Sequence, residues 1–310
     1  MIHAKELVKT FGETVAVDHA SFRVKEGDIV GFLGPNGAGK TTTLRILTCF
    51  MPATSGTATV GGHDVHTESL AVRRLIGYMP ENVPLYGEMR VREYLDYRAR
   101  LKGVRSRPDR KRKVDDIIRK CWLEEVEHRL CSQLSKGFRQ RVGLADCLVH
   151  DPKILILDEP TVGLDPNQIR ETRRLIKELG HKHTVLLSTH ILPEVEMICD
   201  HVIIIYKGKI AASGTPDELR RAHAGKAGVR VEVAGPQDRV EQALRTLDGV
   251  GSVSRKTEDG RTVFEIEARG EADLRPAVAK RIAENGWTLV ELHRSVPTLE
   301  DIFAAITMRE

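Results

Sequence analysis

The sequence has few cysteines, and their spacing argues against two kinds of cross-linked protein. There are five, an odd number, with no C-x-x-C pair among them: Cys49, Cys121, Cys131, Cys147 and Cys199. A disulfide framework or a structural zinc site would need paired or regularly spaced thiols. We therefore expect five reduced thiols in the core of a cytosolic protein.

A long hydrophobic run is also missing. The most apolar stretches, KILILD at 153–158 and HVIIIY at 201–206, are far shorter than the ~20 residues that span a bilayer. The first residues, MIHAKELVKTF, lack the apolar core of a signal peptide. We therefore expect no membrane span, so that any work at a membrane would need another protein to hold this one there.

The net charge is small for the length of the chain. Lys and Arg number 48 and Asp and Glu 44, a formal charge of +4, which does not require nucleic acid or anionic lipid as a partner. The 310 residues, 41% hydrophobic and 30% charged, are ordinary for a soluble protein with one large domain and one smaller domain.

Short β-branched runs alternate with amphipathic segments up to about residue 215. The runs DIVGFLG, KILILDE, TVLLSTH and VIIIYKG read as strands, and segments such as KTTTLRILTCF and PNQIRETRRLIKELG read as helices. Continuous apolar strands that alternate with helices predict an α/β fold with a parallel sheet covered on both faces. Residues 88–150 break this rhythm, since 88–103 and 110–130 read as helices with no strand between them, and we expect a helical insertion there.

A second domain is predicted at the C-terminal end of the chain. The stretch AHAGKAG at 222–228 is rich in glycine and small residues and reads as a linker. Beyond it the pattern is βαββαβ, with a last helix at TLEDIFAAI, which is the order of a ferredoxin-like α+β domain. The expected domains are therefore 1–222 and 226–310.

The stretch GPNGAGKTT at 34–42 fits the pattern G-x-x-x-x-G-K-[ST] of a phosphate-binding loop. It follows a predicted strand and opens a predicted helix, as such a loop must, although a simple glycine turn remains the alternative for so short a pattern. Glycines let successive N–H groups turn inward, Lys40 reaches the β and γ phosphates, and Thr41 offers a hydroxyl to magnesium. The candidate binding residues are Gly34, Pro35, Asn36, Gly37, Ala38, Gly39, Lys40, Thr41 and Thr42.

A pair of acids ends a buried strand in KILILDEP. Ligands of open α/β sheets lie at the carboxyl ends of the strands, where this pattern places Asp158 and Glu159. Asp158 can hold magnesium together with Thr41, and Glu159 can act as general base on the attacking water. Two carboxylates could also merely cap a strand end, but beside a phosphate loop they indicate the P-loop NTPase fold, with a nucleotide and Mg²⁺ as cofactors.

With these motifs the chain resembles the ATP-binding subunit of an ATP-binding cassette (ABC) transporter. The elements that carry the likeness follow the family's order over residues 1 to about 222. They are the phosphate loop, LSKGFRQR at 134–141, the acidic strand, GLDP at 163–166 and STH ending at His190. The chain is similar in these motifs to exporter subunits that carry a single cassette, including those likened to gliding-motility components.

The resemblance implies roles for further residues. Phe11 occupies the place of the aromatic ring that stacks on adenine, and His190 that of the switch histidine. Ser135 and Gly137 belong to the signature, where a hydroxyl and open N–H groups before a helix form an anion site, and Asp165 belongs to the loop after the acidic strand.

The family's arrangement implies partners that a single chain does not contain. In it, ATP lies between the phosphate loop of one subunit and the signature of a second copy, in a head-to-tail dimer that closes on ATP and opens on hydrolysis. The resemblance also implies integral membrane permease subunits that hold this chain at the cytoplasmic face of the membrane. Nucleic acid is not an expected partner.

One position departs from the family's usual wording. IGYMPEN places Glu81 where the family usually has glutamine. A carboxylate only accepts hydrogen bonds and adds negative charge near magnesium, whereas an amide also donates. We expect Glu81 to be a site residue that acts through water or a cation.

Other interpretations depend on weaker signals. An ABC-type ATPase acting on nucleic acid would be expected to carry coiled coils or zinc modules, yet Lys40 to Leu134 contains neither heptads nor C-x-x-C. A nucleotide-gated scaffold is disfavoured by Glu159 and His190. HDVH at 63–66 is read as a loop rather than a metal pair, and RSRPDRKRK at 105–113 as a solvated helix start.

Overall fold

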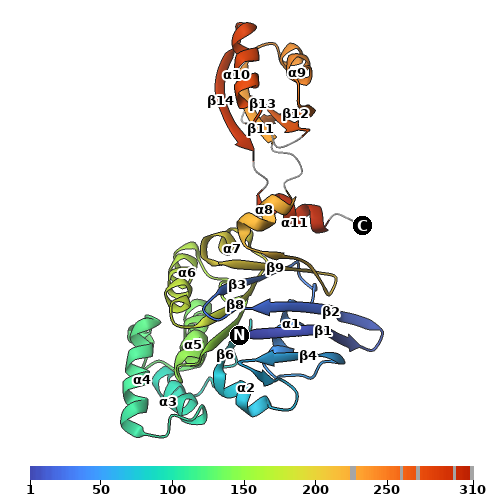
Figure 1. Ribbon diagram of the computed structural model, residues 1–310. Coiled ribbons are helices and arrows are strands. Elements are labelled where there is room, and N and C mark those ends of the chain that lie inside the picture. The colour runs from blue at the N-terminus through green and yellow to red at the C-terminus, as the bar shows by residue number, and fades with distance from the viewer. Residues whose placement is uncertain (224–227, 259–260, 270–272, 296–297, 308–310) are drawn as a thin grey trace. The chain divides into compact units, whose positions relative to one another are not determined.

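The chain forms two compact units. The computed structural model describes residues 1–223, 228–258, 261–269, 273–295 and 298–307 (Figure 1). The first unit comprises Met1–Pro216, and the second begins at Asp217. Most of the linker predicted at 222–228 falls on 224–227, outside the described residues.

An antiparallel sheet opens the first unit. Its strand order is β2-β1-β4-β5, and the strands are β1 (Ile2–Phe11), β2 (Thr14–Val24), β4 (Ser55–Val60) and β5 (His63–Asp64). The register of β1 against β2 shifts three times along the pair. The sequence reading had no strand here, because these bulges interrupt the strict alternation of apolar and polar residues by which a half-buried strand is recognised.

A central six-stranded sheet carries the chemistry of the first unit. Its order is β10-β9-β3-β8-β7-β6, parallel except for the edge strand β10. The strands are β3 (Ile29–Leu33), β6 (Ile76–Met79), β7 (Ile154–Asp158), β8 (Thr184–Thr189), β9 (His201–Tyr206) and β10 (Lys209–Gly214). Every residue of β3, β7 and β8 is buried, as the continuous apolar runs predict for a sheet covered on both faces.

Helices connect and cover this sheet. They are α1 (Lys40–Leu47), α2 (Ser69–Leu75), α6 (Pro166–Gly180) and α7 (Leu192–Ile198). Helix α8 (Pro216–His223) follows β10 and begins the second unit. Helix α1 contacts both β4 of the antiparallel sheet and β7 of the central sheet. The core beneath it is tightly packed, with the rings of Phe22 and Phe32 5.3 Å apart.

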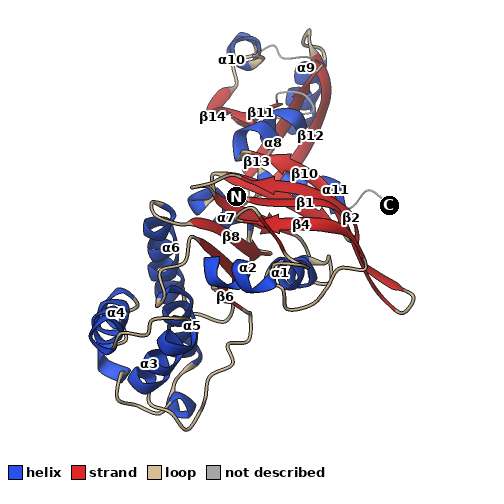
Figure 2. Ribbon diagram, turned by 60° about the horizontal axis from the view of Figure 1, so that its bottom comes forward, coloured by secondary structure: helices blue, strands red, loops and turns tan. Residues whose placement is uncertain are grey.

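Three helices lie in the sequence between the phosphate loop and the acidic end of β7, and they form a separate group (Figure 2). They are α3 (Val91–Leu101), α4 (Arg107–Lys120) and α5 (Lys136–Leu148), and a pair of hydrogen bonds joins Arg98 of α3 to Asp146 of α5. The predicted helix over 110–130 is wrong in its second half. Trp122 adopts a φ of 51°, a left-handed conformation that a helix cannot continue through, so α4 ends at Lys120 and short 3₁₀ turns follow.

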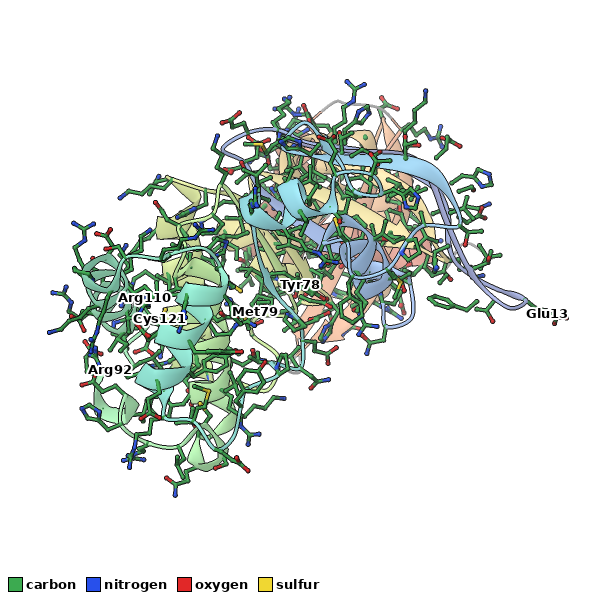
Figure 3. All side chains as sticks on the ribbon, turned by 90° about the horizontal axis from the view of Figure 1, so that it is seen from below. Glu13, Tyr78, Met79, Arg92, Arg110 and Cys121 are labelled. Carbon is green, nitrogen blue, oxygen red and sulfur yellow. The ribbon has the colours of Figure 1, made fainter. Side chains whose placement is uncertain are left out.

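Side chains in this helical part meet in ion pairs, and Figure 3 labels Arg92, Arg110 and Cys121 there. Arg92 contacts Asp115 and Glu127, and Arg110 contacts Asp96 of α3. The contacts with Asp115 and Asp96 join α3 to α4, and the contact with Glu127 joins α3 to the turn that follows α4.

The second unit has the ferredoxin-like pattern predicted from the sequence. Its elements are β11 (Gly228–Ala234), α9 (Gln237–Arg245), β12 (Val250–Glu258), β13 (Arg261–Ala268), α10 (Arg275–Glu284), β14 (Thr288–Ser295) and α11 (Leu299–Thr307). The sheet order β12-β13-β11-β14 is antiparallel throughout, so the first strand lies between the third and the last. Valines of β11 and Phe264 form the core with the inner faces of α9 and α10.

All five cysteines are free thiols, as expected, but one is not a core residue. Cys49 is only half-buried, because it follows α1 at a φ of 57° where the chain turns away from the core, while the other four are buried. Burial raises the pKa of the Cys121 and Cys147 thiols to about 12. Among the described residues, no helix has the length and apolarity that crossing a bilayer requires.

Candidate active site

The loop between β3 and α1 has a backbone that only glycine can follow at two positions. Gly39 has a φ of 103°, and a Cβ there would lie 2.4 Å from the carbonyl oxygen of Ala16. A Cβ on Gly34 would lie 2.5 Å from the carbonyl oxygen of Ile205. Gly37 also has a positive φ, of 80°, but faces open space. The loop is therefore wedged between strands and curls with its N–H groups at the start of α1, which suits an anion.

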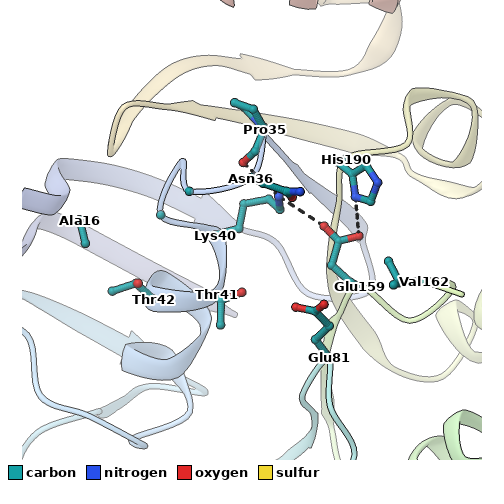
Figure 4. Close-up of a pocket in the computed structure, with 12 residues that line it drawn as sticks. Ala16, Pro35, Asn36, Lys40, Thr41, Thr42, Glu81, Glu159, Val162 and His190 are labelled. Atoms are coloured by element: carbon teal, nitrogen blue, oxygen red, sulfur yellow. Dashed lines mark hydrogen bonds and ion pairs between the residues drawn. The ribbon is translucent and has the colours of Figure 1, made fainter.

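Lys40 spans this loop with a buried ammonium group. Its side chain is 6% exposed, and Nζ donates to the carbonyl oxygens of Gly34 at 2.8 Å and Pro35 at 3.2 Å. The same Nζ lies 3.3 Å from Oε1 of Glu159 (Figure 4). A cation is thus held at the mouth of the loop, opposite the acidic strand end.

Asp158 and Glu159 are oriented by the neighbouring strand. Ser188, the register partner of Asp158, donates its hydroxyl to Asp158 Oδ1 at 2.5 Å. Its oxygen also accepts the backbone N–H of Glu159 at 3.0 Å. Glu159 itself takes a φ of 49°, an unfavourable backbone conformation for a non-glycine residue that turns the chain at the strand end.

The oxygens here fit a divalent cation. Asp158 is fully buried, and its Oδ2 atom has no hydrogen-bond partner among the described residues. The hydroxyl of Thr41 lies 3.3 Å from the other oxygen of the same carboxylate. A carboxylate and a hydroxyl are the hard oxygen ligands that Mg²⁺ accepts, usually with water and phosphate completing its shell.

His190 completes the contacts of Glu159. Its Nδ1 atom lies 2.9 Å from Oε2 of Glu159, so the carboxylate is held between an ammonium group and an imidazole. Glu159 is 5% exposed, whereas the side chain of His190 is 43% exposed. The acid is therefore fixed in place while the histidine remains open to a ligand.

These groups surround a cavity of about 410 Å³. It is lined by Ala16, Pro35, Asn36, Gly37, Gly39, Lys40, Thr41, Thr42, Glu81, Glu159, Val162 and His190 (Figure 4). The volume lies in the range of small-molecule sites. One cavity thus brings together residues from the loop, from the segment after β6, and from the ends of β7 and β8.

Seven of the predicted site residues lie outside this cavity lining: Gly34 and Ala38 of the loop, Asp158 beside Thr41, and the more distant Phe11, Ser135, Gly137 and Asp165. Phe11 ends β1 with half of its surface exposed, and the ammonium group of Lys9 lies 5.2 Å from its ring centre. Ser135 caps α5 by accepting from the N–H of Phe138 at 3.4 Å. Asp165 likewise caps α6. A Cβ on Gly137 would meet the side chain of Gln168 at 2.4 Å, so the signature helix packs closely on α6.

Two residues of the site were missed in the sequence reading. Ser188 belongs to the STH stretch, which was read only for its histidine, although a hydroxyl beside an acidic strand end is a signal for such a contact. Gln140 of α5 donates from Nε2 to the backbone carbonyl of Glu81 at 3.2 Å. The loop that carries Glu81 is therefore bonded to the same helix that Ser135 caps.

The weaker signals have structural explanations. His63 lies 2.8 Å from Glu68, and within the described parts of the chain no three histidine, cysteine or acidic side chains are grouped to hold a metal ion. The basic run begins α4, with Ser106 accepting from the N–H of Asp109 as the cap. The basic run is the helix start expected from the sequence, but the loop expected at HDVH is wrong in its first half, because His63 and Asp64 form the short strand β5.

Each of the two units matches the sequence model of a known protein family. The sequence model of the family described as ABC transporter matches residues 17–162. A second, described as the C-terminal domain of DrrA1-3-like ATP-binding proteins, matches residues 214–307.

Curated relatives match over one or both units. YbhF of Escherichia coli, named a probable multidrug ABC transporter ATP-binding protein, is 41% identical over 225 residues, which is 72% of this chain and 39% of YbhF. This chain thus spans well under half of that relative's length. LnrL of Bacillus subtilis, named a linearmycin resistance ATP-binding protein, is 31% identical over 318 residues, which is 100% of this chain and 99% of LnrL.

A solved structure shares the fold of the first unit. The ATP-binding cassette MJ0796, in a dimeric post-hydrolysis state bound to ADP and Pi, superposes with a TM-score of 0.65 and 26% identity, over 69% of this chain and 98% of its own. Dimeric cassettes therefore occur among proteins similar to this one. The fold class and the family resemblance predicted from the sequence are confirmed, and the chain belongs to the ATP-binding subunits of ABC transporters, a family of ATP-hydrolysing cassettes.

Proposed function

We propose that the protein powers a membrane complex that exports drug-like molecules. The observation that carries this proposal is the convergence of Lys40, Thr41, Glu159 and His190 on one cavity. Export of that class of cargo is supported by the names of YbhF and LnrL, which refer to multidrug transport and to linearmycin resistance. Separate permease subunits hold the chain at the cytoplasmic face of the membrane.

In the proposed mechanism, the loop binds the phosphates of ATP, and the acidic strand end binds magnesium and activates water. The N–H groups of residues 34–40 and the Lys40 ammonium bind the β and γ phosphates of ATP. Thr41 and Asp158 hold Mg²⁺, which when bound offsets charge on the phosphates. Glu159 accepts the proton of the attacking water, and His190 holds that water or the γ phosphate.

The same proposal assigns a second anion site to the other copy of the chain. Ser135 and Gly137 bind the γ phosphate of ATP held by the partner, and Asp165 contacts the partner near it. The assignment of an anion site is supported by the place of Ser135 and Asp165 at the N-terminal ends of α5 and α6, where backbone N–H groups suit an anion. Phe11 stacks on adenine, and Glu81 senses the site through water while its loop meets the permease. The catalytic domain extends over 1–222, with a helical part at 88–150, and the accessory domain over 226–310.

Phosphate release by the purified protein tests the ATPase. Turnover of ATP is expected with Mg²⁺ and not with EDTA, and Lys40→Ala is expected to lose both nucleotide binding and turnover. A folded wild-type chain that binds ATP without releasing phosphate would contradict the proposal.

Mixed dimers test the shared site. Lys40→Ala and Ser135→Arg are each expected to be inactive, since each destroys both sites of its own dimer. Mixing them leaves one intact site in every mixed dimer, so up to about a quarter of wild-type turnover should return. If mixed dimers form and no activity returns at any ratio, the head-to-tail assignment is wrong.

A further inference from the structure

A buried acid that the proposed mechanism does not use lies four residues after His190. Glu194, on α7, is 1% exposed. A buried carboxylate is strongly disfavoured unless its oxygens are paired. Both oxygens of Glu194 are paired, and the partners point to a role beyond the packing of α7.

The contacts of Glu194 hold the chain on both sides of His190. Oε2 accepts the hydroxyl of Thr189 at 3.0 Å, and the oxygen of that hydroxyl accepts the backbone N–H of Ile191 at 3.0 Å. Residues 189 and 191 are thus joined to the same carboxylate, one directly and one through Thr189. The backbone of His190 lies between two fixed points.

The opposite oxygen of Glu194 anchors this arrangement to another helix. Oε1 accepts from Nη2 of Arg173 at 3.0 Å, and Arg173 lies on α6, the helix that Asp165 caps. On its other side, the end of β8 is fixed by Ser188, which contacts Asp158 and Glu159. His190 is therefore the exposed tip of a strand end that is fastened to the acidic pair and to α6.

We propose that Glu194 is a positioning residue, whose buried carboxylate holds Thr189 so that the His190 imidazole stays on Glu159. Arg173 balances the charge of Glu194 and ties the His190 loop to α6, whose first turn is in the region assigned to the partner's nucleotide. This inference rests on the role proposed for His190 in ATP hydrolysis.

Three near-isosteric variants test the contact. Glu194→Gln and Thr189→Val are expected to lower kcat about tenfold while KM for ATP changes less than twofold, because the phosphate loop is untouched. Thr189→Ser keeps the hydroxyl and is expected to stay within twofold of wild type. Asp146→Asn is the control, since it also breaks a buried ion pair, with Arg98 and Lys102, but lies on α5 away from His190.

A double variant separates positioning from general destabilisation. In a His190→Ala background, Glu194→Gln should cost less than a further twofold in kcat, because the residue it positions is already gone. A further tenfold loss in that background, or an equal loss of kcat in Asp146→Asn, would overturn the inference. Unchanged kcat in both Glu194→Gln and Thr189→Val would overturn it as well.

NMR of the histidine rings gives a readout that needs no turnover. Glu194→Gln and Thr189→Val are expected to shift or broaden the His190 ring signals, and Asp146→Asn is expected to leave them in place. If the wild-type chain does not hydrolyse ATP, the proposed function fails, and the ring signals still decide the contact. If it hydrolyses ATP and the ring signals do not move, only this inference fails.

Discussion

The two units of the chain bury polar side chains very differently. Among the described residues, the first unit buries fourteen polar or charged side chains, among them Lys40, Asp158, Glu159 and Glu194. The second unit buries one, Thr262. Its core otherwise consists of aliphatic side chains and Phe264, packed between a sheet and two helices.

This difference separates a core that performs chemistry from one that only packs. Removing a charge from water is unfavourable, so buried charges persist where partners hold them. In the first unit those partners connect strand ends, as Ser188 connects Asp158 and Glu159. The second unit has no comparable cluster among its described residues, and we expect its substitutions to change stability rather than turnover.

The largest effect should come from the acid that the first unit buries beside Lys40. Glu159→Gln keeps the shape of the side chain but removes the base, so ATP turnover should fall about 1,000-fold. Nucleotide affinity, measured by equilibrium dialysis of labelled ATP, should change little. Turnover equal to wild type would remove the general-base role and weaken the contrast between the cores.

The apolar core of the second unit should respond in stability alone. Phe264 is fully buried there, and Phe264→Ala should lower the free energy of unfolding of that unit by about 3 to 5 kcal/mol. Calorimetry is expected to show the loss, while ATP turnover at a temperature below the transition stays within twofold. A proportional fall in turnover would show that the packing core is needed for the chemistry.

Two glycines of the phosphate loop give a matched pair within the first unit. Gly39→Ala would place a methyl group against the Ala16 carbonyl and should weaken ATP binding at least tenfold. Gly37 has the same kind of left-handed backbone but faces open space, so Gly37→Ala adds only about 1 kcal/mol of backbone strain. ATP binding should therefore weaken less than it does in Gly39→Ala. Titration with a fluorescent ATP analogue measures both. Equal effects would mean that backbone conformation, and not the close approach, limits the loop.

The smallest effect concerns acid stability. Burial lowers the pKa of His150 to about 4, with nearby Lys102 acting in the same direction. Between pH 6.5 and 4 the unfolded chain binds this proton and the folded chain does not, so stability falls as the pH falls, by about 3 kcal/mol in all. Thermal unfolding of the first unit should show this slope, and His150→Gln should reduce it.

The second unit offers the contrast for that measurement. Its Asp273 has a pKa lowered to about 2 by hydrogen bonds from Arg275, but that carboxylate is exposed and contributes little once solvent screens it. Unfolding of the second unit should therefore change little over the same pH range. A slope there as steep as in the first unit would assign the acid sensitivity to another group.

Much of the fold could be predicted because its signals are local. Continuous apolar runs indicated the buried parallel strands, and the βαββαβ order indicated the second unit. The antiparallel sheet of residues 2–64 was missed, because register shifts between Ala4 and Thr10 disturb its alternation. The end of α4 was missed because the left-handed conformation of Trp122 depends on its surroundings, where Arg141 and Arg174 lie against its ring.

The sequence by itself determined the phosphate loop and the acidic pair, because glycine spacing and a strand-end carboxylate act over a few residues of chain. Only the tertiary structure decided which distant groups meet. Parallel register sets Ser188 against Asp158, and helix packing brings Arg173 to Glu194. It also decided that Ser135 and Asp165 lie outside the cavity lining that holds Lys40. Such contacts depend on distances across strands and helices, which no short stretch of sequence encodes.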